Sequence, residues 1–233
     1  MNYSFPAFPL LLAAFFAASS GRAQTIAQWT FEISQPAGFF SAGTWFTNIS
    51  SEVGPGTASG LHAGNPFLSS PAGNGSAHSF SATNFAVGDF YQFEVSTVGF
   101  SGIRLEWDQT SSNTGPRDNR LDYSTDGINF TAFGSGYTIL ANASPNPTWN
   151  STTFNAIYHY SQDLSSVTAL NNASTVYFRL IDTSTTSANG GTVGSGGTDR
   201  VDNFTIEVVP EPQTLALLSG FGILALNFIR RRK

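Results

Sequence analysis

Apolar and polar residues alternate along four short segments in the middle of the chain. The alternating segments are 91–96, 103–108, 176–181 and 203–208. Because successive side chains of a β-strand point to opposite faces, each segment predicts a strand with one apolar face and one largely polar face. Such strands form antiparallel sheets that are packed on one side, and two of these sheets bury their apolar faces against each other. We therefore predict an all-β fold, an antiparallel two-sheet β-sandwich.

Turn residues separate the predicted strands. Asp126-Gly127 lies between two β-type runs, which is a strong signal for a β-hairpin. Residues 187–200 are rich in glycine and predict a loop between the last two strands. Neither an internal repeat nor a shift in composition divides residues 24–209, which we interpret as one β-sandwich domain.

One segment between the strands has a helical pattern. In residues 163–174, Ser165 or Ser166 is suited to cap a helix that turns Val167 and Leu170 toward the core. We predict a single short helix here.

The first 23 residues have the features of a secretory signal peptide. An apolar run over residues 8–18 is followed by small residues, which predicts cleavage by signal peptidase between Ala23 and Gln24. The run lacks a preceding Lys or Arg. The alternative is a buried N-terminal helix, which Pro6 and Pro9 disfavour.

A second apolar segment closes the chain. Residues 214–229 span about 24 Å as a helix, less than the roughly 30 Å hydrocarbon core of a bilayer. The four residues that follow are all cationic and hold that end in the cytoplasm: Arg230, Arg231, Arg232 and Lys233. We predict a single transmembrane helix that inserts transiently and leaves the domain outside; the alternative is an ordinary tail anchor.

The order of features in residues 210–233 resembles a known sorting signal. Pro210-Glu211-Pro212, the apolar segment and the basic end are together similar to the PEP-CTERM signal of biofilm-forming Gram-negative bacteria. The resemblance implies cleavage near the tripeptide by an exosortase, followed by release to, or attachment at, the outer surface or the extracellular matrix. The two prolines lack backbone N–H groups and so keep this junction out of helix and sheet. The junction stays extended and accessible to a protease.

Charge and cysteine content exclude several functions. Residues 24–209 contain five arginines, no lysine and fourteen carboxylates, which gives a formal charge of −9. We predict that the domain does not bind nucleic acid, because such binding depends on neutralising phosphates with Lys and Arg. The chain has no cysteine, so it has neither thiolate chemistry nor disulfides. Calcium or a polysaccharide is a more natural partner.

Several strand segments resemble jelly-roll modules of the galactose-binding, discoidin-like kind. The residues that carry this resemblance are WTFE at 29–32, YSTDGINF at 123–130, VYFRL at 176–180 and DRVDNFTIEV at 199–208. The export signals and the acidic, lysine-free, hydroxyl-rich surface predict a non-catalytic module that contacts extracellular polysaccharide. The resemblance itself implies a structural calcium ion where the first and last strands approach each other.

Glu32, Asp199 and Asp202 are the residues that this calcium site would use. Carboxylate oxygens are the hard ligands that calcium takes in proteins. The alternative is that Glu32 pairs with Arg200 while the two aspartates shape the entry to the last strand.

Polar residues on two of the predicted strands suggest a carbohydrate site. The set consists of Arg104, Glu106, Asp108, Tyr177 and Arg179, which would gather charges and an aromatic ring if the two strands are neighbours. The alternative is a solvated sheet face with exposed ion pairs, each contributing at most about 1 kcal/mol.

A catalytic role would fall on two of the same residues. Glu106 and Asp108 lie two apart on one strand, at a spacing compatible with the carboxylate pair of a glycosidase. The chain contains neither an HExxH zinc motif nor a G-x-S-x-G nucleophile elbow. We predict a non-catalytic surface or matrix protein. The alternatives are a secreted glycan-active enzyme using Glu106 and Asp108, and a structural surface protein without a ligand.

Overall fold

The structure, a computed structural model, describes residues 23–210. Its strands, in chain order, are β1 (Gln24–Trp29), β2 (Gly38–Phe39), β3 (Trp45–Ser50), β4 (Thr57–Leu61), β5 (Phe67–Ser69), β6 (Phe80–Thr83), β7 (Phe90–Val95), β8 (Phe100–Ser111), β9 (Asp118–Ser124), β10 (Thr131–Thr138), β11 (His159–Asp163), β12 (Val176–Asp182) and β13 (Thr198–Pro210).

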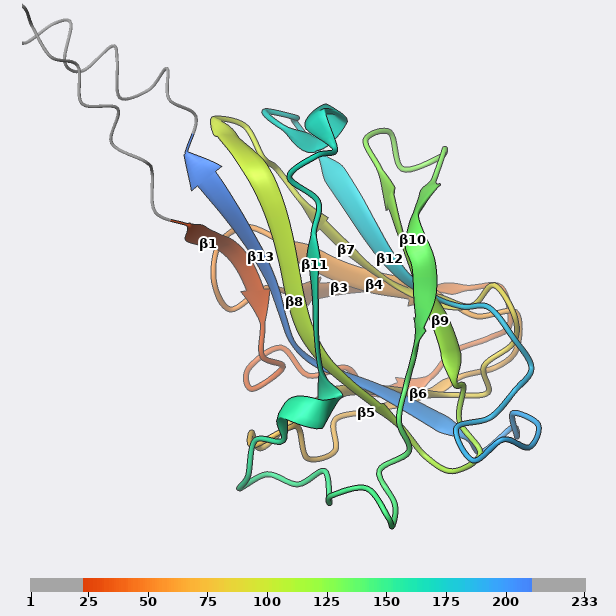
Figure 1. Cartoon of the computed structure of the whole chain (residues 1–233). Helices are drawn as coiled ribbons and strands as arrows, with labels where there is room; N and C mark the ends of the chain where they lie inside the picture. The colour runs from red at the N-terminus through yellow and green to blue at the C-terminus, as the bar shows by residue number, and fades with distance from the viewer. Residues whose placement is uncertain (1–22, 211–233) are drawn as a thin grey trace, which may run out of the picture.

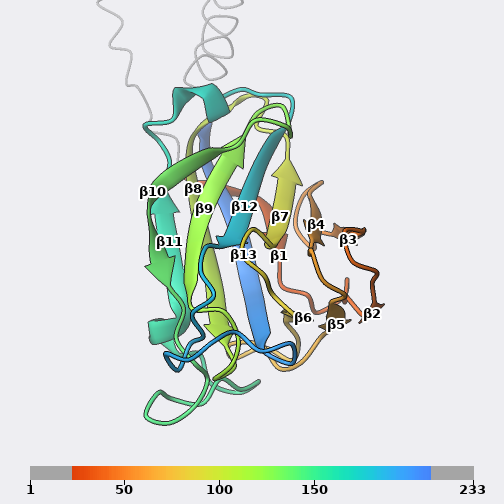
Figure 2. The ribbon, with the colours of Figure 1, turned by 90° about the vertical axis from the view of Figure 1, so that its right-hand side faces the viewer.

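These strands form two antiparallel sheets that face each other, as the alternation predicted (Figures 1 and 2). Sheet A has the order β11-β8-β13-β6-β5-β2, and β1 also pairs with β13. Sheet B has the order β10-β9-β12-β7-β4-β3. The predicted all-β sandwich is confirmed.

One hydrophobic cluster fills the space between the sheets. The inward residues Ile103, Leu105 and Trp107 of β8 have no exposed surface. Phe93 of sheet B stacks on Phe204 of sheet A, with ring centroids 3.5 Å apart. Both sheets therefore contribute the apolar faces that the alternation predicted.

The predicted hairpin joins β9 to β10 in sheet B. Asp126 Oδ1 accepts hydrogen bonds from the amides of Ile128 and Asn129, at 2.9 and 2.8 Å. Gly127 follows with a φ of +72°, a conformation that glycine adopts without a steric penalty. The Asp-Gly signal is thus confirmed, and so is the glycine-rich loop between β12 and β13.

The predicted short helix is wrong in type and in its cap. Within residues 23–210 the only helical turns are the 3-10 turns η1 (Ala156–Tyr158) and η2 (Thr168–Leu170). Leu170 is buried as expected, but Val167 is the capping residue and no side chain caps the turn. Asn171 returns to extended backbone after one turn, so no α-helix can propagate.

The described part of the chain begins and ends at the same place. Gln24 at the start of β1 is paired with Val208 near the end of β13 (Figure 1). Apart from Ala23 and Gln24 at the predicted cleavage point and Pro210, the predicted signal peptide and sorting tail lie outside the described residues. No helix within residues 23–210 is long and apolar enough to span a membrane.

Candidate functional site

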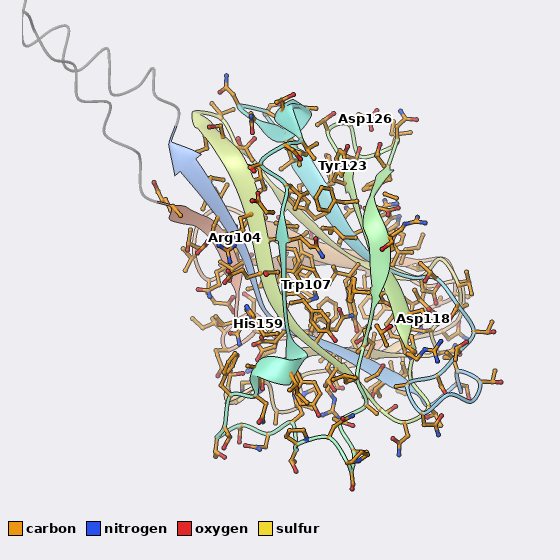
Figure 3. The ribbon with its side chains drawn as sticks, in the orientation of Figure 1. Arg104, Trp107, Asp118, Tyr123, Asp126 and His159 are labelled. Carbon is orange, nitrogen blue, oxygen red and sulfur yellow. The ribbon has the colours of Figure 1, made fainter. Side chains whose placement is uncertain are left out.

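The five residues of the predicted carbohydrate site lie on two different sheets. Arg104, Glu106 and Asp108 belong to β8 of sheet A, whereas Tyr177 and Arg179 belong to β12 of sheet B. The side chains of each set point away from the core, so the two sets are on opposite outer faces of the sandwich. Figure 3 shows Arg104 on β8 and His159 on β11, away from Asp118, Tyr123 and Asp126 in the β9–β10 hairpin of sheet B. The prediction of one joint site is therefore wrong.

On sheet A, Asp108 is enclosed rather than solvated. Its side chain is 1% exposed. Asp108 Oδ1 accepts a hydrogen bond from His159 Nδ1 at 2.9 Å, and Oδ2 accepts one from Asn203 Nδ2 at 2.9 Å. Burial raises the pKa of Asp108, and the hydrogen bonds from Asn203 and His159 oppose this rise.

This enclosure bears on the glycosidase alternative. Both oxygens of Asp108 are held by neighbouring side chains, and Glu106 forms an ion pair with Arg104 at 2.8 Å. A general acid or nucleophile must reach the glycosidic bond, which a buried carboxylate with two fixed partners does not do. The geometry therefore disfavours catalysis by this pair.

The three residues of the predicted calcium site are not brought together. Asp199 and Val201 face the core of the sandwich, whereas Asp202 faces outward from β13. Asp199 Oδ2 accepts a hydrogen bond from Gln109 Nε2 at 2.7 Å inside the sandwich. Glu32 Oε1 accepts a bond from the amide of His78 at 2.8 Å. Across residues 23–210 no group of three His, Cys, Asp or Glu side chains is arranged to hold a metal ion.

Asp202 instead organises a loop. Its Oδ2 accepts hydrogen bonds from Ser76 Oγ at 2.6 Å and from the amide of Asn74 at 2.9 Å. A Cβ atom at Gly73 would lie 2.2 Å from the same oxygen, so only glycine allows this approach. Burial raises the pKa of Asp202 to about 7, and the bonds from Ser76 and Asn74 oppose the rise. These contacts hold the loop around Asn74 and Ser76, whereas the alternative placed the role of Asp202 at the entry to the last strand.

On sheet B, Arg179 lies among aromatic rings. Its guanidinium carbon is 3.9 Å from the ring centre of Phe90 and 3.5 Å from that of Phe130. The ring of Trp45 is 5.8 Å away, and Arg179 Nε donates to Gln92 Oε1 at 2.8 Å. We call Trp45, Phe90, Phe130, Tyr177 and Arg179 the arginine–aromatic face.

Four separate segments build this face. Trp45 begins β3 at the edge of the sheet, Phe90 begins β7, and Tyr177 and Arg179 are on β12. Phe130 precedes β10 and contacts Tyr177 edge-on, with ring centroids 6.5 Å apart. Residues this far apart in the sequence give no local pattern, so the sequence pointed to Tyr177 and Arg179 but missed the other three.

The face combines a flat ring with a desolvated cation. Trp45 is 41% exposed, whereas the other three tryptophans are 5% exposed or less. Burial lowers the pKa of Arg179 to about 10, and the charge of Asp122 opposes this shift. An exposed aromatic ring stacks on the apolar side of a sugar, and a guanidinium donates hydrogen bonds in one plane. The arrangement is therefore suited to hold a saccharide.

Comparisons with known proteins give loose similarities. No protein-family model and no curated protein sequence matches the chain. The K3 cleaved adhesin domain of Lys-gingipain from Porphyromonas gingivalis W83 has a TM-score of 0.40 and 16% identity, covering 78% of this chain and 98% of that one. The N-terminal CBM22 tandem domain of Xyn10C from Paenibacillus barcinonensis has a TM-score of 0.44 and 10% identity, covering 84% of this chain and 49% of that one.

A third similar structure is discoidin II from Dictyostelium discoideum. Its TM-score is 0.30 at 14% identity, covering 57% of this chain and 42% of that one. The similar structures thus include carbohydrate-binding modules, cleaved adhesin domains and a discoidin.

Proposed function

We propose that this chain is a non-catalytic surface or matrix protein that binds extracellular polysaccharide through the arginine–aromatic face. The observation that carries the proposal is the half-exposed ring of Trp45 beside the guanidinium of Arg179 on one sheet face. An exposed large aromatic ring held next to fixed polar groups is a binding feature rather than a packing feature. The low content of Lys and Arg agrees with a carbohydrate partner rather than a nucleic acid.

Replacing residues of this face is expected to abolish polysaccharide binding. Trp45→Ala removes the platform and Arg179→Ala removes the cation, so each is expected to weaken binding about 10-fold or more. The measurement is a binding isotherm of the full chain against the exopolysaccharide of its native host. Arg104→Ala is the matched control, because Arg104 is exposed on the opposite sheet.

Two outcomes would contradict the proposal. A flat isotherm for the unaltered chain would favour a structural protein without a ligand. Release of reducing ends that Glu106→Gln abolishes would favour the glycan-active enzyme instead.

We also propose that the chain reaches the cell surface through its two terminal segments. Signal peptidase would act after Ala23, and an exosortase would act near Pro210-Glu211-Pro212, after transient insertion of residues 214–229. The support is the order of tripeptide, apolar segment and basic end. The start of β1 also lies beside the end of β13, where Gln24 pairs with Val208.

The intact mass of the protein from its native host tests this sorting proposal. A mass that ends near Pro210-Glu211-Pro212 is expected in matrix or medium, and any added mass would identify an attached group. Recovery only from membranes, with Arg230 to Lys233 retained, would indicate a plain tail anchor.

A further inference from the structure

We propose that the arginine–aromatic face selects acidic saccharides, with the terminal nitrogens of Arg179 binding a sugar carboxylate while the sugar ring stacks on Trp45. This inference rests on the proposed function and adds the chemical class of the ligand. Five observations on the described residues lead to it.

The first observation is that only one edge of the Arg179 guanidinium is available. Phe90 and Phe130 lie against the group at 3.9 and 3.5 Å, and Nε is bound to Gln92. Among the side chains and carbonyls that the structure describes, only Gln92 accepts a hydrogen bond from the Arg179 side chain, and it does so from Nε. The terminal edge, with four N–H groups, is left for a ligand.

The second observation is that Asp122, the carboxylate opposite Arg179 on the neighbouring strand, is already occupied. Asp122 Oδ1 and Oδ2 accept bonds from Arg120 Nε and Nη2, at 2.6 and 2.8 Å. Asp122 is also buried. Turning it toward Arg179 would break its two-pronged ion pair with Arg120. Arg179 therefore forms no ion pair within the part of the chain that the structure describes.

The third observation is that the charge of Arg179 is half-buried. Removing a cation from water is unfavourable unless an opposite charge compensates it. The lowered pKa of Arg179 has this origin, since burial is its main cause. The charge of Asp122 offsets this cost only in part, and an incoming anion would supply further compensation.

The fourth observation concerns shape. Two parallel N–H groups of a guanidinium match the two oxygens of a carboxylate, which makes this pairing stronger and more directional than a bond to a hydroxyl. The guanidinium carbon of Arg179 lies over the ring of Trp45, 5.8 Å from its centre, so the cation and the exposed part of this ring are adjacent. A uronate stacked on Trp45 can thus place its carboxylate at Arg179.

The fifth observation is that the overall negative charge does not prevent this contact. Exposed charges more than about 8 Å apart are largely screened at physiological salt. Two of the five arginines in residues 24–209, Arg120 and Arg179, lie on strands of sheet B, and the charge of Arg120 is paired with that of Asp122. The charges of Glu94 and Asp126 act on Tyr177, and that of Asp122 acts on Arg179. A saccharide carboxylate bonded directly to the guanidinium gains a charge-assisted pair against these carboxylates.

The experiment compares acidic oligosaccharides with their neutral counterparts. The full chain is titrated with oligogalacturonate, oligoglucuronate and oligomannuronate, and with each oligosaccharide after reduction of its carboxyl groups. We expect at least one acidic form to bind about 10- to 100-fold more tightly than its reduced form, because a charged hydrogen-bonded pair is lost on reduction. Raising the salt concentration is expected to narrow that ratio.

Variants assign the discrimination to one side chain. Arg179→Gln is expected to bind the acidic and reduced forms equally. Arg179→Lys is expected to keep only part of the affinity ratio, because lysine lacks the parallel N–H groups of a guanidinium. Arg104→Gln, on the other sheet, is the matched control and is expected to keep the whole ratio. Equal thermal melting of the variants shows that a lost ratio does not reflect unfolding.

The failures are distinguishable. Equal affinity for acidic and reduced forms, or binding only to the host polysaccharide, would overturn the carboxylate inference and leave the polysaccharide proposal standing. No binding to the host polysaccharide either would overturn both. Equally tight binding of a short peptide through its C-terminal carboxylate would contradict selection for a saccharide.

Discussion

Raising the pH from about 6.5 to about 9 is expected to lower the free energy of unfolding, and Asp199→Asn is expected to remove most of that loss. Asp199 is completely buried between the sheets. Burial raises its pKa from 3.8 to about 8, and the hydrogen bond from Gln109 opposes the rise. The folded chain therefore keeps a proton that the unfolded chain has already released.

The sign follows from proton binding. Where the folded state binds more protons than the unfolded state, stability falls as the pH rises. The stabilisation that the bound proton of Asp199 adds to the free energy of unfolding is complete below pH 3.8 and is lost above about pH 8. At about 1.4 kcal/mol per pH unit, the interval from about pH 6.5 to about pH 8 costs about 2 kcal/mol.

Other buried groups set the limits of the experiment. Asp202, with a pKa raised by burial to about 7, adds a smaller loss of the same sign. Burial lowers the pKa of His62 to about 4, so protonation of the unfolded chain lowers stability between about pH 6.5 and pH 4. A starting point of about pH 6.5 excludes most of the His62 contribution.

Urea unfolding at several pH values measures the effect. Asn at position 199 keeps an oxygen for Gln109 but does not ionise, so Asp199→Asn is expected to be more stable than the unaltered chain at about pH 9. Asp163→Asn is the control, because Asp163 is exposed. Parallel pH profiles for the unaltered chain and Asp199→Asn would show that Asp199 does not carry a buried proton.

Trp29→Ala is expected to destabilise the fold by about 3–5 kcal/mol, the usual cost of deleting a buried tryptophan. Trp29 has no exposed surface and lies edge-on to Phe93 and Phe204, with ring centroids 5.1 and 6.0 Å away. Its Nε1 also donates to the carbonyl of Ile49 at 3.0 Å, linking β1 to β3 of the other sheet. The substitution leaves a cavity between the sheets and a carbonyl without its partner.

Trp45→Ala is the matched control for this substitution. Trp45 is 41% exposed and contacts Phe90 edge-on, so its loss is expected to cost about 1 kcal/mol or less. Chemical unfolding of both variants at one pH provides the comparison. Similar losses for the two tryptophans would contradict the assignment of Trp29 to the core and Trp45 to the binding face.

The strands could be predicted from the sequence because alternation depends only on which face of a strand is buried. The apolar positions of 103–108 and 176–181 are those that the core covers. Alternation does not say which strands are neighbours. In the structure β8 pairs with β11 and β13, whereas β12 pairs with β7 and β9. For this reason Arg104 and Arg179 were wrongly grouped.

Alternation also fails where loops cover the outer face of a sheet. Asp108 and Asp202 occupy outward positions, yet both are buried. Reciprocal bonds between Asn74 and Asn155 hold two loops together next to them. Such contacts join residues 81 positions apart. No local pattern signals them, so the buried carboxylates could not be predicted.

Tryptophan fluorescence tests the binding face most directly. Of the four tryptophans, Trp45 is the one with substantial exposure, so a saccharide stacked on the arginine–aromatic face changes chiefly its emission. Titration of the full chain with the exopolysaccharide of its host is expected to give a saturable change in emission that Trp45→Phe abolishes. Binding that leaves the emission unchanged, or a change that persists in Trp45→Phe, would contradict the placement of the ligand on this face.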